Sequence, residues 1–364
     1  MRIAMVCPYA LTRPGGVQGQ VLALARALRA QGHPVRVIAP ADDPAALAVL
    51  DPGAVGVGRP VGVRANGSVA PLALWPLAAH RARAAVLASG ADVAHLHEPL
   101  APLTGYGLLV AGGPPMVGTF HRSGFGRVDE VLAPLARLAL RRLDARVAVS
   151  AAARDTAAAL GGGEYEVLFN GVEVARFAAV DPWPTDRPTV LFLGRHEERK
   201  GLGVLLEAFE KVPDPARLWV AGTGPATSAL RRRFPSSPRV EWLGALDHDE
   251  VPRRLAGADV LCAPSLFGES FGMVVVEAMA AGTPVVASDI PGYRDAAGGL
   301  ALLVAPGDPA ALADALTATL ADARRGTGLS SPVRRAEAAA RAASWSIEAL
   351  AVAYLGVYRR VLSR

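Results

Sequence analysis

The chain has 364 residues, of which 51% are hydrophobic and 20% are charged. This length predicts two domains of ordinary size, and the composition excludes a largely disordered chain. The net charge of +5 comes from arginine, because Lys200 and Lys211 are the only lysines. This positive charge is consistent with an anionic partner, either a nucleotide or a membrane surface, and equally with a general preference for arginine in the genome.

Cysteine use and hydropathy indicate a cytoplasmic protein. Cys7 and Cys262 lie in apolar runs, where we expect buried thiols in a reduced compartment. The chain enters a predicted strand at residues 2–7 without a signal segment, and Gly, Pro, Arg or Glu interrupt each apolar run before it could span a bilayer. Peripheral binding to the inner face of the plasma membrane stays open, and nucleic acid is not expected as a partner.

The first half of the chain predicts a doubly wound α/β domain. Strands are expected at residues 2–7, 35–39, 93–96, 116–120, 147–150 and 166–169, and helices at 21–29, 44–50, 77–89 and 132–143. Residues 64–68 have turn chemistry. Gly15 and Gly16, between the first strand and the first helix, let the backbone approach a phosphate, although the dinucleotide fingerprint G-x-G-x-x-G is absent.

Histidines follow two of these predicted strands. His121 stands at the carboxyl end of the strand at 116–120, the edge at which open α/β sheets place ligand chemistry. His95 and His97 lie beside Glu98, but one lies within a strand and the other at its end. We therefore expect no metal site there.

The predicted helix at 132–143 is amphipathic. Its leucines at positions 135, 138 and 143 fall on one side, and its arginines at 137, 141 and 142 lie elsewhere around it. We interpret the leucines as packed on the sheet, with the arginines solvated. Docking of this helix on anionic lipid is the alternative.

The second half predicts another doubly wound unit. Strands are expected at 189–194, 218–221, 240–243, 260–263, 285–288 and 302–304, and helices from Met273, at 309–323 and at 336–362. Three prolines, at 182, 184 and 188, mark a linker before this half. The sequence GTGP at 222–225 lacks the third glycine of a Rossmann signature, which argues against NAD.

Two loops of the second half have the chemistry of an anion site. Gly268 and Gly272 allow a tight turn just before the helix that begins near Met273, and the positive end of that helix suits a diphosphate. Glu269 and Glu277 can reach the same ligand from the turn and from the helix. Arg195 and Lys200 project from a second loop between a strand and a helix, so two cations can converge on one diphosphate.

These segments resemble the retaining glycosyltransferases of family 4. The matching segments, in chain order, are GGVQ at 15–18, TFH at 119–121, NGV at 170–172, GRHEERKG at 194–201 and FGESFGMVVVE at 267–277. The resemblance implies the α/β GT-B fold, with two Rossmann-like, doubly wound parallel-sheet domains that face a central cleft. Residues 1–169 would bind the acceptor, residues 170–343 the nucleotide sugar, and residues 344–364 would form a helix that crosses back to the first domain.

The resemblance also implies roles for individual residues. The catalytic group would be His121, Arg195, Lys200 and Glu269. The donor-binding group would be Gly16, Arg195, Lys200, Leu246, Glu269, Ser270, Phe271, Gly272 and Glu277. The acceptor-binding group would be Tyr9, Gln18, Asn66, Ser68, Arg122 and Arg199. Arginine and lysine would supply the positive charge, so neither a metal nor a cofactor beyond the nucleotide-sugar donor is expected.

Within the family, NGSVA at 66–70 and GESFG at 268–272 are similar to mannosyltransferases that use GDP-mannose and a phosphatidylinositol-type lipid. Our prediction is therefore a retaining transfer of mannose to such a lipid. His248 and Val251 depart from the guanine-site pattern, and Arg81 and Arg83 keep only part of a membrane-binding basic helix. The alternatives are a UDP- or ADP-sugar used on a soluble acceptor, a GT-B nucleotide-sugar epimerase, and a non-catalytic protein with this fold. The oligomeric state is not predicted.

Overall fold

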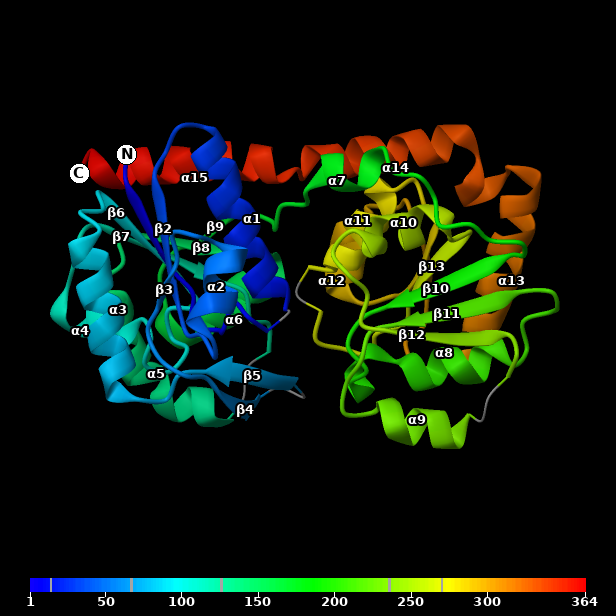
Figure 1. Ribbon diagram of the computed structural model, residues 1–364, viewed down its shortest axis with the longest axis horizontal. Coiled ribbons are helices and arrows are strands. Elements are labelled where there is room, and N and C mark those ends of the chain that lie inside the picture. The colour runs from blue at the N-terminus through cyan, green and yellow to red at the C-terminus, as the bar shows by residue number, and fades with distance from the viewer. Residues whose placement is uncertain (14, 66–67, 125–126, 235–236, 270) are drawn as a thin grey trace. The chain divides into compact units, whose positions relative to one another are not determined.

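The computed structural model describes residues 1–364 except 14, 66–67, 125–126, 235–236 and 270, and the side chains of 64–69 and 125–132 are also outside the description. The chain divides into two units (Figure 1). The first consists of Met1–Gly171 with Ile347–Arg364, and the second is Val172–Ser346. These bounds are displaced by a few residues from the expected 1–169, 170–343 and 344–364.

The first unit contains a parallel sheet with the strand order β3-β2-β1-β6-β7-β8-β9. Its strands are β1 Ile3–Val6, β2 Val35–Ala39, β3 Val55–Gly56, β6 Val93–His97, β7 Met116–Phe120, β8 Ala145–Ala148 and β9 Glu166–Val167. The order reverses between β1 and β6. The loops that follow these strands therefore leave one edge of the sheet at a switch point, where ligands of such folds bind.

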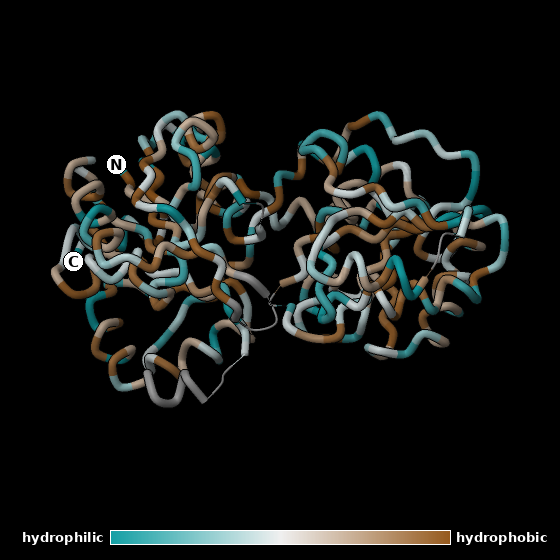
Figure 2. The backbone as a smooth tube through the Cα atoms, turned by 60° about the horizontal axis from the view of Figure 1, so that its bottom comes forward, coloured by the Kyte–Doolittle hydropathy of each residue, from teal (hydrophilic) through white to brown (hydrophobic). Residues whose placement is uncertain are grey.

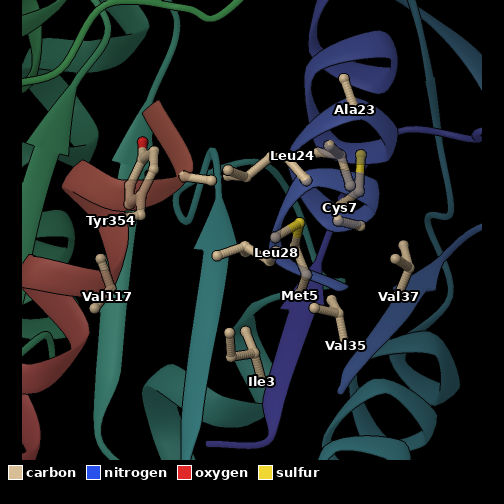
Figure 3. Packing of buried hydrophobic residues seen from close by; sticks show 14 of the residues in the cluster. Ile3, Met5, Cys7, Ala23, Leu24, Leu28, Val35, Val37, Val117 and Tyr354 are labelled. Atoms are coloured by element: carbon tan, nitrogen blue, oxygen red, sulfur yellow. The ribbon is translucent and has the colours of Figure 1, made fainter. Parts of the chain in front are cut away.

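Helices cover both faces of this sheet. They are α1 Gly16–Ala30, α2 Pro44–Leu50, α3 Pro76–Ala88, α4 Tyr106–Ala111, α5 Arg127–Leu140, α6 Ala151–Gly161 and α15 Ile347–Leu362. Figure 3 shows Leu24 and Leu28 of α1 beside Met5 of β1, and Tyr354 of α15 on the side of Val117 of β7; all five are buried in one cluster. The C-terminal segment is thus part of the core of the first unit, because its apolar stripe covers that face of the sheet.

An antiparallel hairpin was missed by the sequence analysis, which predicted only a turn at 64–68. Strands β4 Val61–Ala65 and β5 Ser68–Leu72 pair with each other. The Ala10 amide donates to the Pro71 carbonyl at 3.0 Å, and Tyr9 forms a bridge with Leu72. The hairpin is therefore held against the loop that follows β1.

The predicted packing of the helix at 132–143 is wrong for two of its leucines. Leu135 is 68% exposed and Leu138 is 63% exposed, whereas Ala133, Ala136 and Leu140 are buried. The stripe that faces inward consists of Ala133, Ala136 and Leu140, so two alanines and a different leucine are buried in place of Leu135 and Leu138.

The second unit contains a parallel sheet with the order β12-β11-β10-β13-β14-β15. Its strands are β10 Thr189–Leu193, β11 Arg217–Ala221, β12 Val240–Gly244, β13 Val260–Ala263, β14 Val285–Ser288 and β15 Leu302–Val304. Its helices are α7 Val174–Ala178, α8 Leu202–Phe209, α9 Thr227–Arg233, α10 Glu250–Gly257, α11 Met273–Ala280, α12 Pro291–Ala297, α13 Pro309–Arg325 and α14 Pro332–Ser344, with short 3-10 turns η1 Glu198–Lys200 and η2 Gly328–Ser330. The switch point lies between β10 and β13.

The interior of each unit is formed mainly by these strands. In the hydropathy-coloured trace, brown hydrophobic stretches run through each unit (Figure 2). The residues of β1 and β13 are all buried. In the part of the chain that the structure describes, no helix is both long enough and apolar enough to cross a bilayer.

Candidate functional site

In the second unit, the loop after β10 lies directly against the chain that follows β13. The contact occurs at Gly201, which has a φ of +69°, and a Cβ built there would lie 1.9 Å from the Pro264 carbonyl oxygen. Only glycine permits this close approach with a left-handed backbone. The approach carries the preceding residue, Lys200, to Glu269.

Five side chains from these two loops form one ion-pair cluster. Lys200 Nζ is 2.6 Å and Arg199 Nη1 is 2.8 Å from the same oxygen, Oε1 of Glu269. Arg199 Nε is 3.0 Å from Oε2 of Glu197, and Arg195 Nη2 is 3.1 Å from Oε1 of Glu197. The cluster therefore contains three cations and two carboxylates, which gives it a net positive charge.

The cluster brings together three residues of the sequence-predicted site, Arg195, Lys200 and Glu269. Arg199 was predicted on the acceptor side, and the structure locates its guanidinium between Glu197 and Glu269. Glu197 was not predicted at all. Its side chain is only 2% exposed, and a carboxylate this deeply buried requires cationic partners.

The turn before α11 has the predicted geometry. Helix α11 begins at Met273, and Gly272 caps it with a φ of +81°. A Cβ at Gly272 would lie 2.6 Å from the Tyr293 ring, so the turn is packed tightly against α12. The Phe271 ring is buried and lies 4.7 Å, between ring centres, from Trp345. Ser270 lies outside the described residues.

Glu277 is the acidic residue of α11 predicted to bind the donor. Desolvation by burial raises the pKa of Glu277 to about 7. The nearby Arg176 guanidinium lowers this pKa and the Glu173 carboxylate raises it, and both effects are smaller than that of burial. Arg176 of α7 also donates to the His248 carbonyl. This hydrogen bond joins α7 to the segment between β12 and α10 that contains the half-buried Leu246.

In the first unit, His121 directly follows β7, as predicted. Its Nε2 lies 2.9 Å from Nδ1 of His97, and the two rings are stacked with their centres 5.2 Å apart. Burial lowers the pKa of His121 to about 3, so its imidazole is neutral at physiological pH. The Glu98 carboxylate accepts hydrogen bonds from the backbone amides of His121 and Arg122, which fixes the chain just after the strand.

Three predicted acceptor residues of this unit, Tyr9, Gln18 and Arg122, lie around the loop that follows β1. Tyr9 is close to Glu98 and Arg122: burial and the Glu98 charge raise the pKa of its phenol, and Arg122 lowers it. Gln18 is buried, with its amide 3.5 Å from the Ala10 carbonyl oxygen. Asn66 and the side chain of Ser68 lie outside the described residues.

Gly16 is the first residue of α1, although the sequence analysis began this helix at residue 21. Its backbone amide therefore belongs to the first helical turn, where amides point along the axis toward a possible anion. Among the described residues, a Cβ built at Gly16 would meet no atom within 4 Å.

Comparison with known proteins identifies the family. The family model described as Glycosyltransferase Family 4 matches residues 14–176, and the one described as Glycosyl transferases group 1 matches residues 187–322. Phosphatidyl-myo-inositol mannosyltransferase of Mycobacterium leprae is 41% identical over 331 residues, which cover 88% of this chain and 87% of that protein. The chain belongs to glycosyltransferase family 4.

A second relative supports this assignment, and a solved structure shows the fold. The protein of the same name from Mycobacterium tuberculosis strain H37Rv is 43% identical over 337 residues, or 88% of each chain. Sucrose-phosphate synthase of Thermosynechococcus elongatus has a TM-score of 0.77 at 23% identity, and the match covers 100% of this chain and 99% of that one. This family 4 glycosyltransferase therefore has the GT-B fold.

Two histidines of this family 4 glycosyltransferase differ in their surroundings. His95 uses both ring nitrogens, at 2.7 Å from the Tyr358 hydroxyl and 2.7 Å from the Thr119 hydroxyl. His97 instead contacts His121, and sequence reasoning missed that contact. Among the residues that the structure describes, no three His, Cys, Asp or Glu side chains are grouped in a way that could hold a metal ion.

The missed residues had weak signals in the sequence. Glu197 lies between cationic neighbours in the loop RHEERK, and His97-Glu98 ends β6 beside the strand that precedes His121. Glu98 has a φ of +44°, which is uncommon for a residue with a side chain. Adjacent parallel strands place His97, Glu98 and His121 at one edge, so a comparison of the predicted strand ends could have paired His97 with His121.

Proposed function

We propose that this glycosyltransferase transfers mannose from GDP-mannose to a phosphatidylinositol-type lipid, with retention of configuration at the anomeric carbon. The names of the two relatives support mannose and the inositol lipid, since both are called phosphatidyl-myo-inositol mannosyltransferase and match 88% of this chain. GDP as the nucleotide rests on the resemblance of the sequence segments to enzymes that use GDP-mannose. The observation that carries the proposal is the ion-pair cluster beside the N-terminus of α11.

The cluster supports binding of a diphosphate. It has one more cation than it has carboxylates, and the N-terminus of α11 adds the partial positive charge of its dipole. Arg195 and Lys200 would hold the diphosphate of the donor. As the bond from the sugar to that diphosphate breaks, negative charge grows on the leaving oxygen, and fixed cations stabilise it without reorganisation.

The remaining residues would orient the reactants. His121 is neutral, so we assign it a hydrogen bond to a sugar hydroxyl rather than general-base catalysis, for which a pKa of about 3 is poorly suited. Glu269 and the backbone of 270–272 would hold the sugar and a phosphate, Gly16 would add an amide, and Glu277 would accept the ribose hydroxyls. Tyr9, Gln18 and Arg122 would contact the head group of the acceptor.

The proposed reaction takes place on one face of the sugar. The bond between the anomeric carbon and the diphosphate oxygen breaks, and the acceptor hydroxyl oxygen bonds to that carbon from the same face. The acceptor proton passes to the phosphate oxygen that leaves. Mannosylated lipid and GDP are the products, and the positive charge comes from Arg195 and Lys200 rather than a metal.

Titration calorimetry with GDP, UDP and ADP, without added metal, tests the donor. We expect GDP to bind most tightly, although His248 and Val251 differ from the guanine-site pattern. Tight binding of UDP together with absent binding of GDP would reject GDP-mannose as the donor.

Product analysis tests the reaction. With labelled GDP-mannose and phosphatidylinositol in detergent, we expect a labelled mannolipid whose NMR spectrum shows the anomeric configuration of the donor. An isomerised free nucleotide sugar without an acceptor product would favour the epimerase alternative. Transfer only to soluble inositol phosphates would favour a soluble acceptor.

A further inference from the structure

The first unit contains an apolar cavity of about 680 Å³. It lies among α4, α5, α6 and the loops that follow β1 and β6; α5 contacts both α4 and α6 (Figure 1). Aliphatic side chains form most of its wall, among them Leu100, Leu109, Val110, Leu135, Leu138 and Leu160. This volume is within the range of about 300–1,000 Å³ that is typical of small-molecule sites.

One part of the cavity wall is polar. Tyr9, Glu98 and Arg122 line it there, and Tyr9 and Arg122 are the residues that we assign to the acceptor head group. The cavity is therefore continuous with the candidate head-group site, and both lie wholly within the first unit. A ligand that fills both parts would combine an anionic or hydroxylated end with a long apolar body.

Large apolar side chains on the cavity wall are also exposed to solvent. Val110 is 72% exposed, and Leu135 and Leu138 on α5 are the two leucines that do not pack on the sheet. Isolated exposed leucines are common, but a group that borders an apolar cavity indicates a binding surface for an apolar partner. Ala136 and Ala139 of α5 line the cavity together with these leucines.

We propose that this cavity receives an acyl chain of the lipid acceptor while Tyr9 and Arg122 contact its head group. The proposal rests on the proposed function. With about 30 Å³ for a group the size of water, the cavity of about 680 Å³ has room for on the order of twenty methylene-sized groups. An acyl chain fits because it is apolar and flexible, and the phosphodiester at its polar end complements the Arg122 cation.

Binding of two soluble ligands without a donor tests the proposal. Lysophosphatidylinositol, used below its micelle concentration, carries one acyl chain, and glycerophosphoinositol carries none. By titration calorimetry we expect the first to bind at least about tenfold more tightly, because burial of each methylene adds to affinity. Equal affinities would overturn the proposal.

A matched pair of variants tests where the acyl chain of the lipid binds. Ala139 lines the cavity on α5, and Ala159 is exposed on α6 outside the cavity wall. Ala139→Phe should fill the cavity and remove the tighter binding of lysophosphatidylinositol relative to glycerophosphoinositol. The affinities for glycerophosphoinositol and for GDP should stay unchanged, which would show that both units are folded. Ala159→Phe should keep the preference. If Ala139→Phe also keeps it, the acyl chain lies elsewhere and the proposal is wrong.

The outcomes distinguish this inference from the proposed function. In one outcome, phosphatidylinositol accepts no mannose, but lysophosphatidylinositol still binds more tightly than glycerophosphoinositol, and only Ala139→Phe removes this difference. The proposed function is then wrong, and the cavity assignment stands. If phosphatidylinositol and glycerophosphoinositol accept mannose with equal kcat/KM, the function stands and the cavity assignment is overturned.

Discussion

Replacing Lys200 with alanine tests the proposed leaving-group site directly. Lys200 Nζ is 2.6 Å from Glu269 Oε1, but Arg199 also contacts that oxygen, at 2.8 Å. The variant therefore leaves Glu269 with a cationic partner. The loss of one half-buried ion pair with such compensation should cost about 1 kcal/mol of folding free energy. In a domain of this size, that loss lowers Tm by about 2–4 °C.

The expected effect on turnover is much larger. The ammonium group of Lys200 would stabilise charge that develops as the glycosidic bond breaks, and removal of one such group lowers kcat by about 10²–10³, or about 3–4 kcal/mol. The difference between a small loss of stability and a large loss of rate is the signature of a role in the transition state. A merely structural lysine would lower Tm and leave the kcat of the folded enzyme near that of wild type.

The assay is steady-state transfer of labelled mannose at saturating acceptor, with Tm measured on the same samples. Lys211→Ala is the matched control, since Lys211 is an exposed residue just after α8. The control should retain wild-type kcat and Tm. A kcat for Lys200→Ala within about threefold of wild type would remove Lys200 from the mechanism, because one lost transition-state contact costs far more.

Three further predictions concern proton binding, ring orientation and backbone strain. Affinity for GDP-mannose should rise about tenfold from pH 6 to pH 8, because Glu277 with a pKa of about 7 must ionise to accept ribose hydroxyls. Without donor, the contribution of Glu277 to stability, measured as the difference in unfolding free energy between wild type and Glu277→Gln, should fall as pH rises from about 4.5 to about 7, since folded Glu277 keeps a proton that the unfolded state releases. His97→Phe should lower kcat about tenfold with unchanged GDP affinity, because His121 loses the ring partner that orients it. Gly201→Ala should lower Tm by several degrees, since its Cβ would lie 1.9 Å from the Pro264 carbonyl oxygen and strain costs about 1–3 kcal/mol.

Each of these predictions has its own control. Glu277→Gln should flatten the pH dependence of donor affinity, and an unchanged slope would exclude Glu277 as its cause. His97→Gln keeps a hydrogen-bonding side chain and should recover part of the rate; equal losses in both His97 variants would point to packing. Gly203→Ala, in helix α8 with 3.4 Å to the nearest side chain, should leave Tm unchanged or slightly raised, and a similar loss at both glycines would refute the strain argument.

The sequence by itself determined the two α/β units and the main elements of the donor loops. The strand at 116–120, the helix at 44–50 and the strands at 260–263 and 285–288 were predicted with the bounds that the structure has. The start of α11 at Met273 also followed from the glycines before it. These features are local, because apolar periodicity and glycine positions within about ten residues decide them.

Tertiary structure alone decided which side chains meet. The contact of His97 with His121 joins neighbouring parallel strands, and the burial of Glu197 depends on cations from its own loop while Glu269 approaches from another. The exposure of Leu135 was decided in the same way, because α5 packs beside α6 and α4 with two of its alanines buried. Such pairings depend on which strand ends share a sheet edge and on how closely two backbones can approach, and neither is encoded in the spacing of residues along one segment.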